Sequence, residues 1–436
     1  ERCETRRQDF GLWIVHARKM HLLKSAVLLI LSLFHLPLLS LSWSITRASL
    51  STLRMTSSPS DNAPQHVVVA GAGVIGVSTS YYLATNFGIR TTVVDPTGQV
   101  ASAASGKAGG FLALDWNDWS PVGQLARRSF SLHQELADTL GADNIQYRRL
   151  TCAALSVNPA LSGRPSGKKL TGIEWIKEDE VQVMRSLGDE STIAQVHPKL
   201  LCENLWKIAS TPQNEGGVGS TLLKGRVVSP AYKDDKLCGA KLTDVTILEC
   251  DAILFACGPW DVNIMQGVKY HSVVIPTPRV LSQSVFFDGL GDPEVYPRPD
   301  STAYCTGFPD QACKVTERPG EEEVRPEAAS RILEAVRQAS GATGNDDGVL
   351  SASPTITQAC YLPSAPDSLP VMGLLPTKYS NHNCFIATGH TCWGILLGPA
   401  SGESMAHLIA TGECNKYVDL RQFDPARFPN IGLCQS

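Results

Sequence analysis

Residues 66–87 read HVVVAGAGVIGVSTSYYLATNF and decide the fold of this chain. The valines predict a strand that is buried on both faces of a parallel sheet. Gly71, Gly73 and Gly76 then follow in the order G-x-G-x-x-G, and the residues after them predict a helix that ends at Gly88. Such glycines permit a tight turn, close approach of a pyrophosphate to the backbone, and close packing of helix on strand. The predicted phosphate-binding residues at this helix N-terminus are Gly71, Ala72, Gly73, Val74, Ile75 and Gly76.

A second strand is predicted at residues 90–95, RTTVVD, and it ends in a carboxylate. Asp95 lies 19 positions beyond Gly76, where an acid receives the ribose hydroxyls of an adenosine. The alternative is a glycine-rich turn in an unrelated α/β domain, but that interpretation does not explain why an acid stands at position 95. Strand, glycines, helix, strand and acid in this order therefore indicate a dinucleotide-binding domain.

Length and composition describe an ordinary globular protein. With 436 residues the chain is long enough for two domains. Its net charge of -4 gives no basic surface for nucleic acid, so no nucleic-acid partner is expected. The 13 cysteines include no C-x-x-C pair, which favours reduced thiols in a reducing compartment over a disulfide framework or a metal site.

Residues 1–63 read as a targeting or disordered leader rather than as part of the fold. From Met20, an apolar run at 25–43 lies between the length of a signal peptide and that of a membrane span, and a Ser-rich, Arg-containing stretch follows. This leader would direct the chain to a plastid, a mitochondrion or the endomembrane system, and to a membrane only if 25–43 is retained. If translation starts at Met55 instead, a cytoplasmic protein is expected.

A run of small residues at 101–116, ASAASGKAGGFLALDW, follows the predicted ribose-binding acid. Small residues let backbone pass close to a large flat ligand. This stretch resembles the flavin-contacting segment of the FAD-dependent D-amino-acid oxidase and sarcosine oxidase superfamily. The resemblance implies FAD contacts at Ser105, Gly106, Lys107, Ala108, Gly109 and Gly110.

Later stretches carry the same resemblance. Residues 225–230, GRVVSP, and 250–260, CDAILFACGPW, resemble the strands beside the adenine. Residues 358–373 and 383–413, with ACYLP and TGHTCWGIL, resemble the closing strands, turn and helix, most of all in a eukaryotic amine-oxidase-like subgroup. The implied FAD contacts are Val227, Gly258, Trp260, Cys360, Gly389, His390, Gly394 and Ile395.

The resemblance implies an α/β fold, α+β overall, with a Rossmann-type FAD-binding domain and an interleaved, mainly antiparallel substrate domain. The FAD-binding domain is expected at 64–155, 195–265 and 360–413, the substrate or cap domain at 156–194 and 266–359, and a C-terminal tail at 414–436. Within the cap we expect antiparallel strands and an amphipathic helix with Ile332, Leu333 and Val336 inward. The acidic run at 321–323 is expected to be a solvated turn.

The superfamily oxidises C–N bonds of amines and of D-amino or N-methyl amino acids. Hydride passes to flavin N5, and O2 then accepts the electrons to give hydrogen peroxide. A flavoprotein whose FAD is structural or sensory, supporting trafficking or assembly, is the alternative.

The expected catalytic residues are Lys107, His390 and Arg298. Lys107 is a cation near flavin N5 or a snorkelling side chain at the domain edge. His390 is expected to contact flavin or substrate and to titrate near neutral pH, or to be satisfied by nearby backbone. Arg298 binds the substrate or forms a surface ion pair in a loop. Trp393 and Tyr361 are expected as aromatic walls of the pocket or as plain core.

The chain departs from its relatives where amino-acid oxidases hold the substrate carboxylate. Leu362 stands where many relatives have an arginine, and Leu396 lies near the place of a lysine. Lys107, Arg279 and Arg298 are the remaining candidate cations; otherwise the substrate is not an ordinary amino acid.

Three further expectations concern the C-terminal region. Cys360 lies where monomeric sarcosine oxidases attach flavin through a thioether, although a buried free thiol is the alternative reading. Gly389, Gly394 and Gly398 are expected to leave room for the isoalloxazine ring. Pro399 is expected at the first position of a helix that ends at Gly412.

Overall fold

The computed structural model describes residues 63–157, 173, 175–176, 181–212, 219–260, 262–308, 310, 312–340, 348–376 and 383–433. The expected leader, with Met20, Met55 and the apolar run 25–43, lies outside the described residues apart from residue 63, and so does most of the loop at 341–348. In the described ranges, no helix combines the length and apolar character that crossing a membrane requires.

A six-stranded sheet brings the expected dinucleotide-binding strands together. β1 (His66–Ala70) lies in parallel between β2 (Arg90–Asp95) and β12 (Ala252–Phe255). The sheet is completed by β20 (Cys384–Thr388) parallel to β12, β8 (Thr221–Lys224) parallel to β2, and β19 (Val371–Leu374) antiparallel to β20. The Rossmann-type part of the predicted fold is therefore confirmed.

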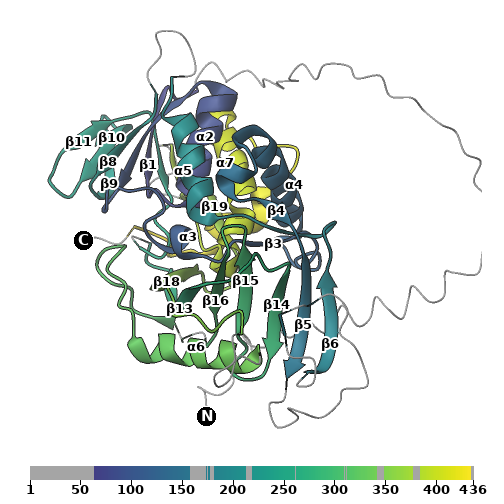
Figure 1. Cartoon of the computed structure of the whole chain (residues 1–436). Coiled ribbons are helices and arrows are strands. Elements are labelled where there is room, and N and C mark those ends of the chain that lie inside the picture. The colour runs from purple at the N-terminus through teal and green to yellow at the C-terminus, as the bar shows by residue number, and fades with distance from the viewer. Residues whose placement is uncertain are drawn as a thin grey trace, which may run out of the picture. The chain divides into compact units, whose positions relative to one another are not determined.

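Helices cover one face of this sheet and a small antiparallel sheet covers the other (Figure 1). Val67 and Val69 of β1 share a core with the helices, whereas Val68 and Ala70 pack on the small sheet. Because both faces are covered, β1 consists of buried apolar residues without alternation. The helices are α2 (Val74–Phe87), α4 (Gly123–Leu140), α5 (Pro198–Ala209) and α7 (Gly394–Thr411); the small sheet is β9 (Val227–Lys233), β10 (Lys236–Leu242) and β11 (Ile247–Glu249).

The second large sheet of the structure has eight strands. It is mainly antiparallel, as expected, with one parallel pair between β14 and β5. Its strands are β17 (Ala312–Cys313), β13 (Gln266–Pro276), β16 (Thr302–Thr306), β15 (Glu294–Arg298), β14 (Gln283–Asp288), β5 (Thr151–Val157) and β6 (Val181–Gly188), with β18 (Ile356–Ser364) paired to β13.

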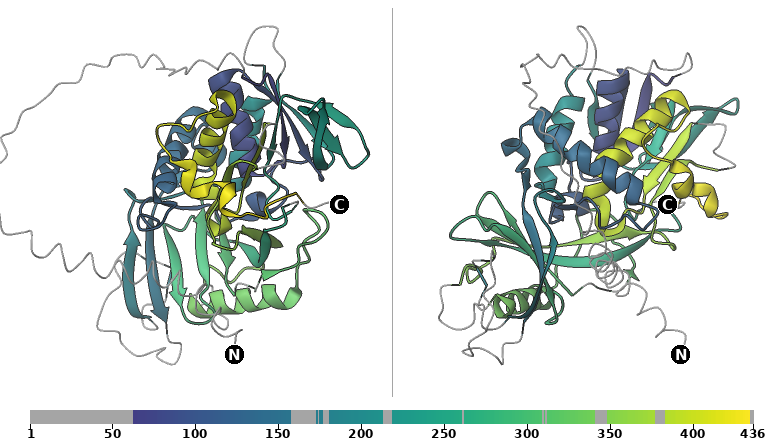
Figure 2. Two further views of the ribbon diagram at one scale, coloured as in Figure 1. Left: turned by 180° about the vertical axis from the view of Figure 1, so that it is seen from behind. Right: turned by 90° about the vertical axis from the view of Figure 1, so that its right-hand side faces the viewer.

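The two faces of this larger sheet have different partners. α6 (Pro326–Ala339) covers the face turned away from α2 and α7 (Figure 2), with Ile332 and Val336 buried and Leu333 half-buried, as expected. The opposite face packs on Phe111 and Trp116, beside a three-stranded sheet of β3 (Phe111–Ala113), β7 (Ile193–Gln195) and β4 (Arg148–Arg149).

Two sheet memberships differ from the expected boundaries. β5 was expected mostly in the FAD-binding segment 64–155 and Cys360–Ser364 of β18 in the segment 360–413, but both strands belong to the eight-stranded sheet. The reason is backbone pairing: β18 pairs with β13 over its whole length, from Ile356 opposite Val274 to Ser364 opposite Gln266. The division into two domains itself stays a prediction.

The chain after α7 packs back onto the first core. Val418, Leu420 and Phe423 are buried with residues of α2 and α7, through η6 (Leu420–Phe423) and η7 (Pro425–Arg427). The described part of the expected tail is thus integral to the core. A further 3-10 turn, η1 (Asp143–Ile145), follows α4.

Helix α7 begins earlier than expected. It starts at Gly394, so Pro399 lies inside the helix and leaves the carbonyl of Ile395 without its helical N–H. His133 Nε2 of α4 lies 3.0 Å from that carbonyl oxygen, and Ser129 Oγ accepts the N–H of Ala400 at 3.0 Å. The helix continues through the proline because α4 supplies the missing hydrogen bonds.

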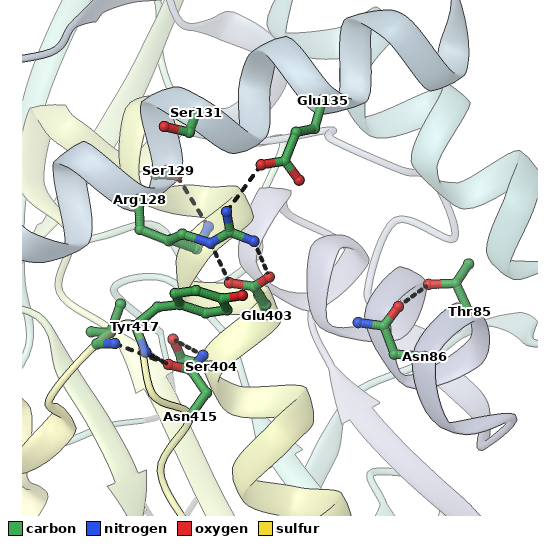
Figure 3. Close-up of polar contacts among 12 residues, drawn as sticks. Thr85, Asn86, Arg128, Ser129, Ser131, Glu135, Glu403, Ser404, Asn415 and Tyr417 are labelled. Atoms are coloured by element: carbon green, nitrogen blue, oxygen red, sulfur yellow. Dashed lines mark hydrogen bonds and ion pairs between the residues drawn. The ribbon is translucent and has the colours of Figure 1, made fainter. Parts of the chain in front are cut away.

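An ion pair also holds α4 to α7 (Figure 3). The Arg128 guanidinium donates to both carboxylate oxygens of Glu403 and to Glu135, and it lies 4.3 Å from the centre of the Tyr417 ring. The side chain of Asn415 donates to Ser404 Oγ at 3.0 Å. Its Oδ1 accepts the backbone N–H groups of Tyr417 and Val418. The middle of α7 is therefore held in place by its neighbours.

Two glycines let α7 approach α2. A Cβ on Gly398 would lie 2.6 Å from Val74 Cγ2, and one on Gly402 would lie 2.4 Å from Ser78 Cβ and 2.8 Å from the backbone nitrogen of Thr79. The expectation that Gly398 makes room for the flavin ring is therefore wrong, because its open side is filled by α2.

Replacing Gly402 by alanine is expected to lower the free energy of unfolding by about 1–3 kcal/mol, because the new methyl group meets backbone that cannot move alone. Denaturant titration measures the change. Gly225→Ala is the matched control, since a Cβ there meets only ordinary contacts at 3.5 Å and beyond. Equal stability of the two variants would contradict the packing argument.

His133 is expected to make stability fall below neutral pH. Burial lowers the pKa of His133 to about 4, whereas an unfolded chain has a histidine pKa near 6.5. The unfolded state therefore binds more protons as pH falls below about 6.5, and stability decreases until about pH 4. Between pH 7 and 5 this amounts to about 2 kcal/mol.

Denaturant titration of His133→Gln tests this, because glutamine still donates to the carbonyl of Ile395 but does not titrate. Its loss of stability between pH 7 and 5 should be smaller than that of the wild type. His407→Gln, on the half-buried part of α7, is the control. An unchanged pH dependence in His133→Gln would refute the assignment.

Candidate functional site

A cavity runs from the turn after β1 to the turn before α7. Its walls come from both sheets and from the segment 317–319. The residues expected at the cofactor that line it are Gly71, Gly73, Val74, Ile75, Asp95, Ser105, Ala108, Val227, Gly258, Trp260, His390, Gly394 and Ile395. The structure thus brings together three regions of sequence that lie more than a hundred residues apart.

The turn between β1 and α2 has room for backbone only. Gly71 has a φ of 106°, and a Cβ there would lie 2.4 Å from the carbonyl oxygen of Ala256. A Cβ on Gly76 would lie 2.1 Å from the carbonyl oxygen of Gly71. Gly73 is the residue before the helix and has no side chain to cap it, so N–H groups in the first turn of α2 after that of Val74 remain available to an anion.

Asp95 fastens this turn to β2. Its Oδ2 accepts the N–H of Ala72 at 3.0 Å, and its Oδ1 accepts the N–H and hydroxyl of Thr97 at 2.9 and 2.6 Å. The residue is buried and lines the cavity where the sequence predicted the ribose site. Ala72 does not line the cavity; its N–H orients the acid instead.

The segment after β2 holds the helix N-terminus from the other side. Ser105, in the short helix α3 (Ala104–Lys107), accepts the N–H of Val74 at 2.9 Å. Its neighbours Gly106, Gly109 and Gly110 are not among the described residues that line the cavity.

Those three glycines instead allow close packing within the protein. A Cβ on Gly106 would lie 2.0 Å from the carbonyl oxygen of Ala101, and one on Gly109 would lie 2.2 Å from Tyr296 Cδ2. Gly110 has a φ of 87°, and a Cβ there would lie 1.9 Å from the carbonyl oxygen of Val196. Their small size serves packing within the protein, which sequence alone could not distinguish from contact with a ligand.

Lys107 reaches away from the cavity to a buried acid. Its Nζ donates to Glu322 Oε2 at 2.6 Å and to the carbonyl oxygen of Ala359 at 3.0 Å. The Glu322 side chain is fully buried. The expected solvated turn at 321–323 is therefore wrong for its middle residue, because Lys107 supplies the countercharge that burial requires.

Glu322 belongs to a segment, residues 312–325, that we call the strap. The strap crosses from β17 over the cavity, which Glu317 and Pro319 line. Trp260 Nε1 donates to the carbonyl oxygen of Thr316 at 2.9 Å, and Arg226 Nη1 donates to that of Glu317 at 3.4 Å. The strap and Arg226 were missed from sequence, although Arg226 directly precedes the expected adenine contact Val227.

His390 forms a sharp turn at the other end of the cavity. Gly389 and Thr391 on either side have φ values of 79° and 51°, the second being costly for a β-branched residue. His390 Nε2 lies 2.9 Å from Ser401 Oγ, and burial lowers the pKa of His390 to about 3. The expectation that His390 titrates near neutral pH is wrong, since this histidine is uncharged there. Gly389 itself does not line the cavity.

Arg298 is buried at the end of β15, so it is not a surface ion-pair partner. Its Nη2 donates to the carbonyl oxygen of Ala108 at 3.2 Å, and its Nη1 lies 3.5 Å from His197 Nε2. Burial and the nearby guanidinium lower the pKa of His197 to about 4. Arg298 does not line the cavity; it holds the backbone of the expected flavin-contacting segment.

The strand β18 forms a wall of the cavity through Tyr361, Leu362 and Pro363. Cys360 is buried beside it, and burial raises the pKa of its thiol to about 12. A protonated thiol is a poor nucleophile, and Cys360 is not among the described residues that line the cavity, so attachment of flavin at Cys360 stays a prediction. Trp260 and Tyr361 meet edge to face with ring centres 6.1 Å apart.

Cys392 was missed from sequence, yet it lines the cavity in the 3-10 turn η5 (Thr391–Trp393). Its side chain is exposed to the cavity while lying deep in the protein, and burial raises the pKa of its thiol to about 11. Thr388 also lines the cavity and donates to the carbonyl oxygen of Gly258 at 2.6 Å.

Comparison with known proteins agrees with this arrangement. The model of the FAD dependent oxidoreductase family, DAO, matches residues 66–408. A Schizosaccharomyces pombe protein named "putative oxidoreductase" is 29% identical over 383 residues, which cover 80% of this chain and 94% of that protein. Glycine oxidase of Bacillus licheniformis is 25% identical over 78% of this chain and 92% of its own length.

Solved structures show the same fold. Glycine oxidase from Geobacillus kaustophilus superposes with a TM-score of 0.66 at 20% identity, covering 83% of this chain and 98% of the other. Iminodiacetate oxidase from Chelativorans sp. gives a TM-score of 0.64 at 19% identity, with 82% and 98% covered.

Glu322→Gln is expected to weaken FAD binding about tenfold, because it leaves the Lys107 ammonium without its countercharge and loosens the strap. Titration of the apoprotein with FAD measures the dissociation constant. Glu321→Gln, an exposed neighbour, is the control and should bind FAD as the wild type does. Unchanged FAD affinity in Glu322→Gln would show that the strap does not depend on the ion pair.

The residues present fit an extended dinucleotide. The glycine turn leaves helix N–H groups open to a pyrophosphate, and Asp95 and Val227, the predicted ribose and adenine contacts, line the same cavity. Together with the match over residues 66–408, these features show that the chain belongs to the FAD-dependent oxidoreductase family and that FAD is its cofactor.

Proposed function

We propose that this protein oxidises the C–N bond of an amine or amino acid and passes the electrons to O2. The substrate loses two electrons and two protons and becomes an imine, which water hydrolyses to a carbonyl compound and an amine. O2 gains the same two electrons and two protons and becomes hydrogen peroxide. When bound, FAD supplies the two-electron acceptor at its N5.

The observation that carries this proposal is the cavity itself, which extends from the phosphate-binding turn to the Gly389–Thr391 turn at the start of α7. Its lining includes the side chains of Tyr361, Leu362 and Ile395, and a substrate packed against them loses part of its hydration. Desolvation and positioning are the main tasks of a protein whose cofactor accepts the electrons.

The first turn of α7 supports the same chemistry. Gly394 and Ile395 line the cavity at the helix N-terminus, where free N–H groups carry a partial positive charge. Such a charge stabilises negative charge that develops nearby during reduction. His390 beside it is neutral, so it adds hydrogen-bonding capacity without adding a charge that would depend on pH above about 4.

The names of relatives favour an amine nitrogen in the substrate. Glycine and iminodiacetate, which two of the similar proteins are named for oxidising, share a C–H bond next to an amine. An amino acid would need a cation for its carboxylate, but Leu362 stands at the expected arginine position and Lys107 is paired with Glu322. Among the described residues that line the cavity, Arg226 is a cation, so the proposed substrate class keeps both amines and amino acids.

A panel of N-methyl amines, N-methyl amino acids, glycine and D-amino acids tests the proposal. At least one compound should yield hydrogen peroxide and the carbonyl product in equal amounts, and should bleach the flavin absorption without oxygen. Gly73→Val, whose side chain would enter the phosphate region, is the control that should lose both FAD and activity. Silence of the whole panel with FAD bound would overturn the oxidase and favour a structural or sensory flavoprotein.

A further inference from the structure

The strap lies over the end of the cavity where the adenosine of FAD is predicted. Gly320 has a φ of 92°, and a Cβ there would lie 3.4 Å from Cγ2 of Thr97, the residue that donates two hydrogen bonds to Asp95. Asp95 is the predicted ribose contact. The carbonyl oxygen of Glu317 accepts from Nη1 of Arg226, which directly precedes the predicted adenine contact. The strap therefore passes beside both predicted contacts of the adenosine.

At this end, the strap separates the cavity from the outside of the protein. Glu317 and Pro319 line the cavity, whereas Arg318 between them is exposed and does not. A second groove lies against strap residues 312–317. Four residues line both the cavity and this outer groove: Arg226, Pro259, Trp260 and Glu317. Movement of the strap away from them would join the cavity to the groove.

Polar contacts, rather than an apolar core, hold the strap in place. Within residues 312–325, all of which the structure describes, Glu322 is the one buried residue. Trp260 Nε1 donates to the carbonyl oxygen of Thr316, and Lys269 Nζ lies 3.6 Å from the exposed carboxylate of Glu323. A segment with little buried apolar surface opens at a lower free energy than the core of a protein.

The ion pair of Lys107 and Glu322 is the buried contact of the strap. Glu322 Oε2 accepts from Lys107 Nζ at 2.6 Å, and its Oε1 accepts the N–H of Gly320 at 3.1 Å. Lys107 belongs to α3, in which Ser105 accepts the N–H of Val74 at the phosphate-binding turn. Because a buried carboxylate without its cation is strongly disfavoured, the pair separates only when Glu322 moves toward water. The ion pair thus connects the strap to the phosphate-binding turn through one short helix.

We propose that the strap is a gate over the adenosine end of the cofactor site, which opens for FAD to enter or leave, and that the ion pair of Lys107 and Glu322 is its latch. With the latch closed, Glu317 and Pro319 form part of the wall around bound FAD. With the latch open, the wall shared with the outer groove is incomplete, and FAD passes through it. The gate concerns the cofactor, so it does not depend on which substrate is oxidised.

A gate and an ordinary contact differ in the rate constants that they change. A contact made only with bound FAD slows dissociation and leaves association unchanged. A gate that is closed for part of the time also slows association, because only the open fraction of the apoprotein admits the ligand. Weakening the latch should therefore raise both rate constants.

Glu322→Gln removes the charge of the latch and keeps the shape of the side chain. Flavin fluorescence after the full-length apoprotein is mixed with FAD gives the association rate constant, and dilution of the holoenzyme gives the dissociation rate constant. We expect increases of about threefold and about thirtyfold, which together correspond to FAD binding that is about tenfold weaker. Glu321→Gln, the exposed neighbour in the strap, is the matched control and should change neither rate constant.

Hydrogen exchange of the holoenzyme measures the opening itself. Backbone amides of the strap should exchange about thirtyfold faster in Glu322→Gln than in the wild type, because exchange follows the open fraction. Amides of β1 and β12 should exchange at the same rate in both proteins, since these strands lie in the core of the six-stranded sheet.

A raised dissociation rate constant with an unchanged association rate constant means that the strap only contacts bound FAD, and this result overturns the gate. Unchanged values of both, or unchanged exchange of the strap amides, overturn the latch. If Glu322→Gln does not fold, Trp260→Phe, which removes the N–H donated to Thr316 and keeps an aromatic ring, is measured against the same outcomes. The proposed oxidase is tested separately by the panel of amines.

Discussion

The turn between β1 and α2 is the constraint on which the rest of this structure depends. It exists only because Gly71 and Gly76 have no side chains, since a Cβ on either would overlap a backbone oxygen. Asp95 and Ser105 each accept one N–H of this turn, and they hold it from two directions. The remaining N–H groups at the start of α2 therefore keep a fixed direction toward the cavity. The turn is therefore preorganised to bind a pyrophosphate.

The second end of the cavity is built by a different device. A proline inside α7 and a strained Thr391 before it both cost free energy. Helix α4 offsets this cost with Ser129, His133 and the Arg128 ion pair, all of which act on α7. The start of α7, which lines the cavity, is thus held by tertiary contacts rather than by local preference.

Charge is distributed unevenly around the cavity. His390 is kept neutral by burial, and Lys107 and Arg298 are bound to protein groups away from the cavity. The same distribution explains why the strap matters: Lys107 is part of a buried pair that closes the cofactor site.

The amino-acid sequence by itself determined the strand, turn and helix at 66–87, the acid at Asp95, the FAD family and the amphipathic helix α6. Each of these depends on residues within a few positions of one another, or on a motif whose spacing reflects one ligand. Tertiary structure alone decided that Gly106, Gly109 and Gly110 pack against protein, that Glu322 is buried, that Pro399 lies inside a helix and that Arg298 leaves the surface. The physical reason is that burial and ion pairing are set by partners far away in sequence: Lys107 and Glu322 are 215 positions apart, and His133 and Ile395 are 262 apart.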